Sequence, residues 1–222
     1  MHRATQERIY EISREFEQGF KFLERFPKSV TFFGSTRVSD GHPDYDHARL
    51  LAGRITRELG YSVVTGGGPG IMEAANRGAK ETGGHSVGLT IRLPKEQVMN
   101  DYLTEHVDFY YFFSRKVCLA YSAEAFLFFP GGLGTLDECL ENITLLQTHK
   151  IPSVPVILVG DGYWENFREF LRKNLLERRT IDPEDLELFT IENDDEKILS
   201  IIKSAPVKEF VPYKGLRVNP IE

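Results

Sequence analysis

The chain has 222 residues, of which 41% are hydrophobic and 27% charged, and it carries a net charge of −6. This length suits one well-buried α/β domain and is short for two, so we treat residues 1–222 as a single domain. No apolar run reaches membrane-spanning length, and the first residues are too charged for a signal peptide, so we expect a cytosolic protein that does not bind membranes. No dense basic run is present, so we do not expect the protein to bind nucleic acid.

A helix is expected first, because apolar side chains recur at helical spacing over residues 5–26, with charges between them. Pro27 ends this pattern, so residues 1–27 form an N-terminal helical extension. Short apolar runs then alternate with helical patterns. Some runs, such as residues 125–129, are apolar throughout, as in parallel strands that are covered on both faces.

The expected strands span residues 30–33, 61–65, 86–91, 107–112, 125–129, 154–159 and 186–191. The later helices are expected at residues 44–59, 69–82, 113–123, 135–149, 163–178 and 194–204. This alternation predicts an α/β protein with a Rossmann-like, doubly wound parallel sheet of about seven strands. Residues 205–222 are interpreted as a packed or loose tail.

Two kinds of residue that often carry chemistry have ordinary interpretations here. Cys118 and Cys139 fall in expected helices, and in a cytosolic protein they are expected to be reduced and buried thiols. Histidine and aspartate gather between residues 42 and 47, but loop and helix N-cap roles suit them, so we expect no metal site.

Glycine-rich turns follow three of the expected strands, at the carboxyl ends where open parallel sheets bind their ligands. They read FFGST at residues 32–36, TGGGPGIM at residues 65–72 and FFPGGLGTLDE at residues 128–138. In the second turn, Pro69 suits the first position of a helix, whose free N–H groups and dipole favour an anion. The alternative is a turn needed only to pack the helix on the sheet.

The second turn departs from the common nucleotide motifs. A dinucleotide fingerprint needs glycine where Ile71 stands, and an acidic residue at the end of the next strand, where this chain has Thr90, Ile91 and Arg92. A P-loop needs Gly-Lys followed by Ser or Thr, and no glycine turn here has it. NAD and ATP-type chemistry are therefore disfavoured.

The third turn has two interpretations. Thr135 and Glu138 have the spacing of a capping box, in which the glutamate only returns a hydrogen bond to the helix start. Alternatively, the helix start holds a phosphate, and Glu138 faces a sugar attached to it. The glycines at 131, 132 and 134 leave the backbone free to approach such a ligand.

Two cations open the expected helix at residues 113–123. Arg115 and Lys116 oppose the dipole there, so we expect an anionic ligand or a carboxylate to compensate them. The alternative is that both are surface cations on the first turn.

Together, these motifs resemble those of the LONELY GUY proteins, which are also labelled lysine decarboxylase-like. The match rests on PGGLGTLDE, the upstream Arg115–Lys116 pair and the other two glycine turns, and it covers roughly residues 28–178. The N-terminal helix, the longer loop at residues 38–46 and the tail resemble the longer bacterial subgroup. The resemblance implies an enzyme that hydrolyses the N-glycosidic bond of AMP or N6-modified AMP, giving free base and ribose 5-phosphate without a metal or other cofactor.

The resemblance also implies site residues and an assembly. Arg115 and Glu138 would be the catalytic pair. The expected substrate contacts are Ser35, Gly67, Gly68, Glu96, Lys116, Gly131, Gly132, Gly134, Thr135 and Thr144. Taken alone, Glu96 is an ordinary loop charge and Thr144 a residue on a helix face. The family forms homodimers or larger homo-oligomers, with the site close to the subunit interface.

Three alternatives to hydrolysis are less well supported by the sequence. A carrier of a nucleotide or of molybdenum cofactor has a similar fold, but the Arg115 and Glu138 pair favours hydrolysis. Lysine decarboxylation needs pyridoxal phosphate on a Schiff-base lysine, and no context marks such a residue. Single-stranded DNA binding needs a basic groove, which the sequence lacks.

Overall fold

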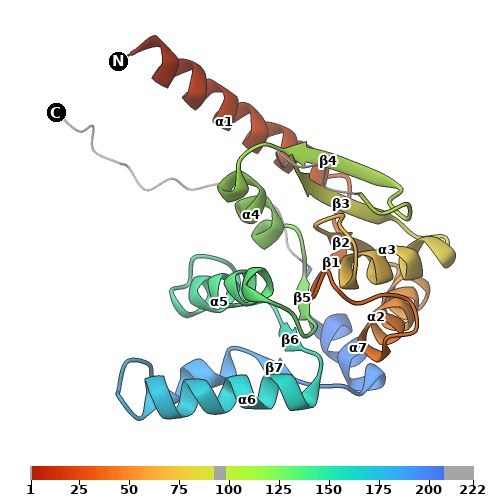
Figure 1. The fold of residues 1–222 in the computed structure, drawn as a ribbon, viewed down its shortest axis with the longest axis vertical. Coiled ribbons are helices and arrows are strands. Elements are labelled where there is room, and N and C mark those ends of the chain that lie inside the picture. The colour runs from red at the N-terminus through yellow and green to blue at the C-terminus, as the bar shows by residue number, and fades with distance from the viewer. Residues whose placement is uncertain (1, 93–98, 208–222) are drawn as a thin grey trace.

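Seven parallel strands form one sheet in the computed structural model, which describes residues 2–92 and 99–207 (Figure 1). The strand order is β4-β3-β2-β1-β5-β6-β7. The strands are β1 (Ser29–Phe33), β2 (Ser62–Thr65), β3 (Ser86–Ile91), β4 (Glu105–Phe109), β5 (Ala125–Phe128), β6 (Val156–Leu158) and β7 (Thr190–Ile191). This order confirms the predicted Rossmann-like, doubly wound sheet.

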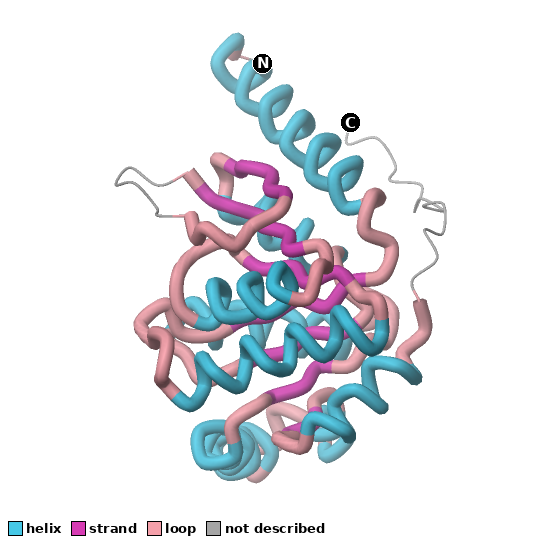
Figure 2. Tube along the Cα trace, turned by 90° about the vertical axis from the view of Figure 1, so that its right-hand side faces the viewer, coloured by secondary structure: helices cyan, strands magenta, loops and turns pink. Residues whose placement is uncertain are grey.

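Helices cover both faces of the sheet (Figures 1 and 2). They are α1 (Arg3–Leu23), α2 (Pro43–Arg54), α3 (Ile71–Glu81), α4 (Phe112–Tyr121), α5 (Leu133–Gln147), α6 (Asp161–Leu171) and α7 (Asp195–Ser204). One hydrophobic core joins the sheet to α2, α3 and α7, and the other joins it to α1, α4, α5 and α6. Along β1, Phe32 faces the first core and Phe33 the second, as the two-residue period of a strand requires.

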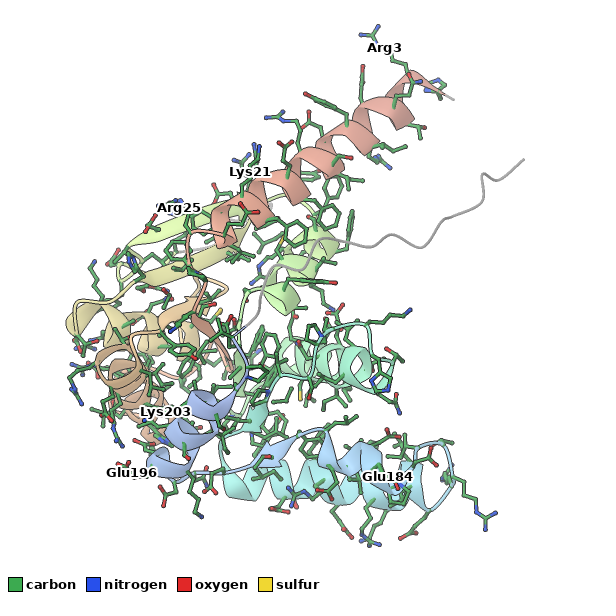
Figure 3. The ribbon with its side chains drawn as sticks, turned by 180° about the vertical axis from the view of Figure 1, so that it is seen from behind. Arg3, Lys21, Arg25, Glu184, Glu196 and Lys203 are labelled. Carbon is green, nitrogen blue, oxygen red and sulfur yellow. The ribbon has the colours of Figure 1, made fainter. Side chains whose placement is uncertain are left out.

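The N-terminal helix α1 forms as predicted and ends before Pro27. Figure 3 shows it reaching beyond the rest of the molecule, with Arg3 at its far end and Arg25 near the sheet. Arg25 pairs with Glu105 on the edge strand β4. Within residues 2–92 and 99–207, no helix is long and apolar enough to cross a bilayer.

Two predicted strands differ from the observed ones. The strand expected at residues 107–112 lies at Glu105–Phe109, because Tyr111 already caps the start of α4. The strand expected at residues 186–191 is reduced to Thr190–Ile191. The first two residues of that expected strand instead end a 3₁₀ helix, Pro183–Glu187. A proline at the first position and a capping box from Asp182 favour this helix.

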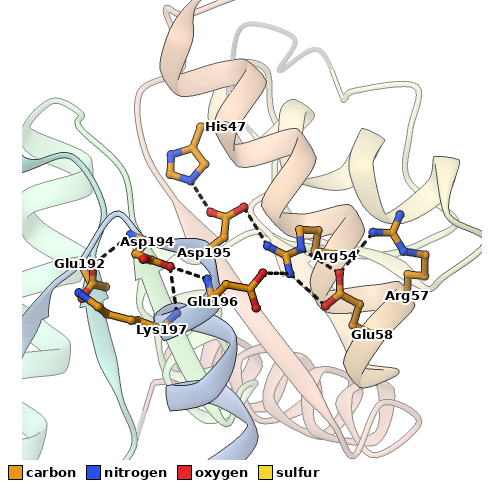
Figure 4. Close-up of polar contacts among 9 residues, drawn as sticks. All are labelled: His47, Arg54, Arg57, Glu58, Glu192, Asp194, Asp195, Glu196 and Lys197. Atoms are coloured by element: carbon orange, nitrogen blue, oxygen red, sulfur yellow. Dashed lines mark hydrogen bonds and ion pairs between the residues drawn. The ribbon is translucent and has the colours of Figure 1, made fainter.

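Charged residues join α2 to α7 (Figure 4). His47 Nε2 lies 2.8 Å from Asp195 Oδ1, and Arg54 lies 2.7 Å from Glu196 and 2.8 Å from Glu58. Each pair is partly exposed to solvent, so each contributes about 1 kcal/mol or less. Together they hold α2 in place, and the start of α2 forms part of the cavity described below.

The sheet changes its winding direction between β1 and β5. These strands are neighbours, with Phe33 paired to Phe128, yet the chain leaves β1 toward β2 and leaves β5 toward β6. The loops after the two strands therefore diverge and open a crevice, the usual place for a ligand in such sheets. Two of the glycine turns, FFGST and FFPGG, lie side by side there.

Candidate functional site

A cavity of about 920 Å³ lies at this crevice. Its wall combines the turns after β1, β2 and β5 with the first residues of α2, α4 and α5. The predicted site residues in its lining are Ser35, Arg115, Lys116, Gly131, Gly132, Gly134, Thr135 and Glu138. The fold thus brings together residues that lie about 100 positions apart in the sequence.

Close backbone contacts lock the three turns together. The N–H of Ser35 donates to Pro130 O at 3.0 Å, and Ser35 O accepts from the N–H of Ile71 at 3.0 Å. Gly70 has φ +75°, and a Cβ there would lie 2.1 Å from Ser35 O, so only glycine fits this crossing. The cavity wall is therefore a rigid unit and not three independent loops.

The second turn supports the site and contributes Gly66 to its lining. A Cβ on Gly66 would lie 2.2 Å from Arg115 Nη2, so this glycine leaves room for the guanidinium. Gly67 and Gly68 lie outside the lining, and their carbonyls accept hydrogen bonds from Asn100. Their predicted contact with substrate stays a prediction.

The start of α3 differs from the expectation for Pro69. The helix begins at Ile71 with Gly70 as its N-cap, so Pro69 lies before the helix and not at its first position. The N–H of Ile71 already donates to Ser35 O. This helix start is thus used in part for packing the turns together.

The start of α5 is open to the cavity. Its N-cap is Gly132, and within the described part of the chain no side chain caps it. The N–H groups of Leu133, Gly134 and Thr135 have no acceptor within the helix, as at any helix start. Such a start, with its positive dipole end, is a ready site for a phosphate or carboxylate.

The capping box that was one of the two interpretations of Thr135 and Glu138 is not formed. The glycines let the helix begin at Leu133, so Thr135 is already its third residue, and Glu138 lies about one and a half turns inside. The Thr135 hydroxyl instead rests against Gly131, where a Cβ would lie 2.1 Å from Thr135 Oγ1. Glu138 therefore does not cap the helix, which was the main alternative to a functional role.

Arg115 and Glu138 share the wall of the cavity and affect each other's charge. Arg115 Nε donates to Leu89 O at 2.7 Å, which fixes the guanidinium. Burial lowers the pKa of Arg115, and the charge of Glu138 works against that shift. Burial raises the pKa of Glu138 to about 7, although Arg115 and Lys116 pull it down. A carboxyl group with a pKa near neutrality can exchange protons at physiological pH.

Comparison with known proteins places the chain in a family. Residues 72–202, more than half of the chain, match a family model described as "possible lysine decarboxylase". A probable cytokinin riboside 5′-monophosphate phosphoribohydrolase of Oryza sativa subsp. japonica is 35% identical over 67% of this chain and 61% of that protein. A cytokinin riboside 5′-monophosphate phosphoribohydrolase of Arabidopsis thaliana is 33% identical over 67% of this chain and 69% of that protein. The chain belongs to the LONELY GUY family. Its named relatives are hydrolases of N-glycosyl bonds, so it is a member of an enzyme family.

Solved structures share the LONELY GUY fold. An X-ray structure from a structural-genomics programme has a TM-score of 0.59 and 27% identity, covering 79% of this chain and 98% of that one. A molybdenum cofactor binding protein from Rippkaea orientalis has a TM-score of 0.55 and 23% identity, covering 79% of this chain and 94% of that one. The second likeness is one of fold alone.

The remaining LONELY GUY positions lie in different surroundings. Lys116 Nζ lies 2.8 Å from Asp137 and 2.9 Å from Glu141. Burial opposes its charge, but these two carboxylates outweigh burial and raise the pKa of Lys116. Thr144 is exposed on α5, outside the cavity lining, and Glu96 lies outside the described residues. Contacts of both with substrate stay predictions.

Sequence reasoning missed several residues of the wall. Arg37 follows FFGST directly and lines the cavity. His42 caps α2, and its ring accepts a hydrogen bond from the N–H of Asp44, which confirms the predicted N-cap role. Tyr163 donates its hydroxyl to Gly131 O at 2.8 Å. Arg37 stands next to a motif residue and could have been found. Tyr163 carries no such signal, because it comes from a helix beyond β6.

Proposed function

We propose that this protein hydrolyses the N-glycosidic bond of a nucleoside 5′-monophosphate, AMP or N6-modified AMP, to free base and ribose 5-phosphate. The observation that carries the proposal is that Glu138 and Arg115 lie on the wall of one cavity, which the open start of α5 also lines. Membership of the LONELY GUY family and the names of the relatives support the same activity.

The start of α5 binds the phosphate in this proposal. Its free N–H groups and the Thr135 side chain grip the phosphoryl oxygens. This grip fixes the ribose inside the cavity, so that binding energy from a non-reacting group is used to orient the reacting one. A substrate without phosphate loses that orientation.

Glu138 acts on the sugar. Breaking the bond leaves positive charge on the ribose, which a nearby carboxylate stabilises. Water adds to C1′, the C1′–N bond breaks with its electron pair going to the base, and Glu138 accepts the proton of the water. Arg115 stabilises the electron density that the departing base gains, and a proton then returns to that base. This chemistry needs neither a metal nor a cofactor.

The proposal predicts a strong dependence on the phosphate. We expect adenine to be released from AMP, with adenosine turned over at least about a hundredfold less efficiently, because it lacks the group that orients the sugar. A panel of nucleoside monophosphates and matching nucleosides, assayed by chromatography for free base, measures this. Equal turnover of AMP and adenosine would remove the phosphate from the mechanism.

The same panel separates hydrolysis from the carrier function. A carrier would bind AMP and return it intact, whereas the proposed enzyme releases base. Lysine decarboxylation is less well supported. Among the described residues that line the cavity, Lys116 is the only lysine, and two carboxylates hold its ammonium. A Schiff base needs a neutral amine, which this pairing opposes.

We also propose that the protein is a cytosolic homodimer. Both cysteines are free and buried, as expected in a reducing compartment. Large apolar side chains are exposed on α1, α4 and α5, on one side of the sheet: Ile9, Tyr10, Phe112, Phe113, Tyr121, Leu133 and Leu140. Leu133, at the mouth of the cavity, is 86% exposed. Apolar surface of this kind is typical of an interface.

Light scattering tests the assembly. We expect a mass of about 51 kDa, twice the 25.4 kDa of one chain. Leu140→Glu on α5 should shift the protein toward monomer, because it places a charge within the apolar face. The matched control is Leu50→Glu on α2, an exposed leucine on the opposite face of the sheet. If both variants or neither dissociate, α5 is not the interface.

A further inference from the structure

The carboxylate of Glu15 on α1 lies at the start of α4, far away in the sequence. Glu15 Oε1 accepts a hydrogen bond from the N–H of Tyr110 at 2.6 Å. Its Oε2 accepts from the N–H of Tyr111 at 3.3 Å and from the Ser114 hydroxyl at 2.6 Å. One side chain thus satisfies two backbone donors and a hydroxyl over the last residues before α4 and its first turn.

The start of α4 needs such a partner. Its N-cap is Tyr111, and within residues 2–92 and 99–207 no side chain of α4 itself caps the helix or places an acid in its first turn. The next residues, Arg115 and Lys116, are cations near the positive end of the helix dipole, an unfavourable arrangement. Carboxylates of α5 offset these two cations, since Glu138 acts on the charge of Arg115, and Asp137 and Glu141 pair with Lys116. Glu15 adds a carboxylate at the donors just before them.

Close packing holds α1 against α4. The helices cross at Gly19, where a Cβ would lie 2.6 Å from Cys118 Sγ and 2.8 Å from Phe109. Aromatic contacts extend the seam, with Phe16 and Phe113 at 6.3 Å between centroids and Phe20 and Tyr121 at 5.8 Å. Glycine inside a helix lowers stability by about 1 kcal/mol relative to alanine. At Gly19 this loss is offset by the close packing of α1 against α4, which a larger side chain would prevent. The Glu15 contacts therefore sit on a fixed seam.

The helix that Glu15 holds also carries Arg115, one turn after the capped residues. The guanidinium reaches Leu89 O and fills the space left by Gly66, so its position has little tolerance. A small shift of the first turn of α4 would move Arg115 relative to Glu138 on α5. Errors of about 1 Å in such a pair cost about a hundredfold in rate.

We propose that Glu15 is a positioning residue of this site, which fixes the start of α4 and thereby holds Arg115 against the cavity. The N-terminal helix is then part of the catalytic apparatus and not an appendage. The proposal rests on the proposed function for its effect on rate, but the placement of Arg115 can be measured separately. Glu15 touches no substrate and acts only through α4.

The test compares Glu15→Gln and Glu15→Ala with wild type. We expect kcat for AMP to fall about tenfold in Glu15→Gln and further in Glu15→Ala, with KM changed less than about threefold, because the phosphate grip on α5 is intact. The Arg115 Nε–H signal in a ¹⁵N NMR spectrum, assigned by its loss in Arg115→Lys, should lose its protection from solvent exchange. Gly19→Ala keeps the carboxylate but separates the helices, and should change both readouts in the same direction.

Glu11→Gln is the matched control. Glu11 lies one turn earlier on α1, and among the residues that the structure describes its carboxylate pairs with Arg14 alone, at 3.4 Å, so its loss should leave kcat and the Arg115 signal at wild-type values. If Glu15→Gln lowers only the melting temperature, Glu15 is merely structural and the proposal is wrong. If wild type releases no base, the proposed function is wrong, while the Arg115 signal still decides whether Glu15 positions that residue.

Discussion

Glu138→Gln is expected to reduce the release of adenine from AMP by about 10²–10⁴-fold, the usual contribution of a positioned general base. The amide keeps the size of the side chain and its place on α5, but it can neither accept a proton from water nor carry the charge that faces the sugar. Binding of AMP should change little, because the phosphate contacts come from the start of the helix.

Two measurements check this result together. Chromatography gives the rate of base release, and calorimetry with AMP gives the affinity of the variant. Glu165→Gln serves as a control, since Glu165 is an exposed carboxylate on α6 that meets Arg168 at 3.4 Å. Normal turnover by Glu138→Gln would reduce Glu138 to a structural residue and end the proposed mechanism. Loss of AMP binding would assign it to affinity instead of chemistry.

The course of the backbone could be predicted from local sequence because the signals were local. Solidly apolar runs such as AFLFF mark the central strands, and glycine turns mark the carboxyl ends of β1, β2 and β5. Placing Ser35, Gly66 and Gly131 around one cavity then follows from the strand order alone. The resemblance to one family added the proposed roles of Arg115 and Glu138, which spacing could not supply.

Sequence reasoning left one helix start open and misplaced another, because helix starts and ends depend on tertiary contacts. Thr135 and Glu138 have the spacing of a capping box, but glycines move the start of α5 to Leu133. Pro69 suits a first helical position, yet Ser35 O takes the N–H of Ile71 and fixes the start of α3 there. Local patterns name residues able to cap a helix, and the packed fold decides which of them do.

No pattern in the sequence predicts the contact between Glu15 and the start of α4. The sequence marks a helix start near residue 113, but the carboxylate that binds the backbone there lies 95 to 99 positions earlier in the chain. Only the crossing of α1 over α4 at Gly19 brings it there. In the proposal, the placement of Arg115 at the cavity thus depends on a helix outside the motif region.

Arg115→Gln is expected to lower kcat/KM for AMP at pH 7 by about a hundredfold and to move its pH dependence. In the wild type, kcat/KM should rise with pH through about 7, because the Glu138 carboxylate is the active form and burial raises its pKa to about 7. The positive charge of Arg115 pulls that pKa down, so removing it should leave Glu138 protonated to higher pH. The rising limb of the profile then moves to higher pH, and part of the lost rate returns in alkaline buffer.

The direction of this movement separates Glu138 from the substrate as the titrating group. The phosphate of AMP also loses a proton, near pH 6, but that step in free AMP is a property of the nucleotide and does not change with the enzyme variant. Profiles of kcat/KM against pH for wild type, Arg115→Gln and the exposed surface control Arg92→Gln, whose side chain lies 3.6 Å from Asp108, test the point. If the rising limb stays at the same pH when Arg115 is removed, the charge of Arg115 does not affect the pKa of Glu138. The proposed mechanism, which depends on that interaction, would then be wrong.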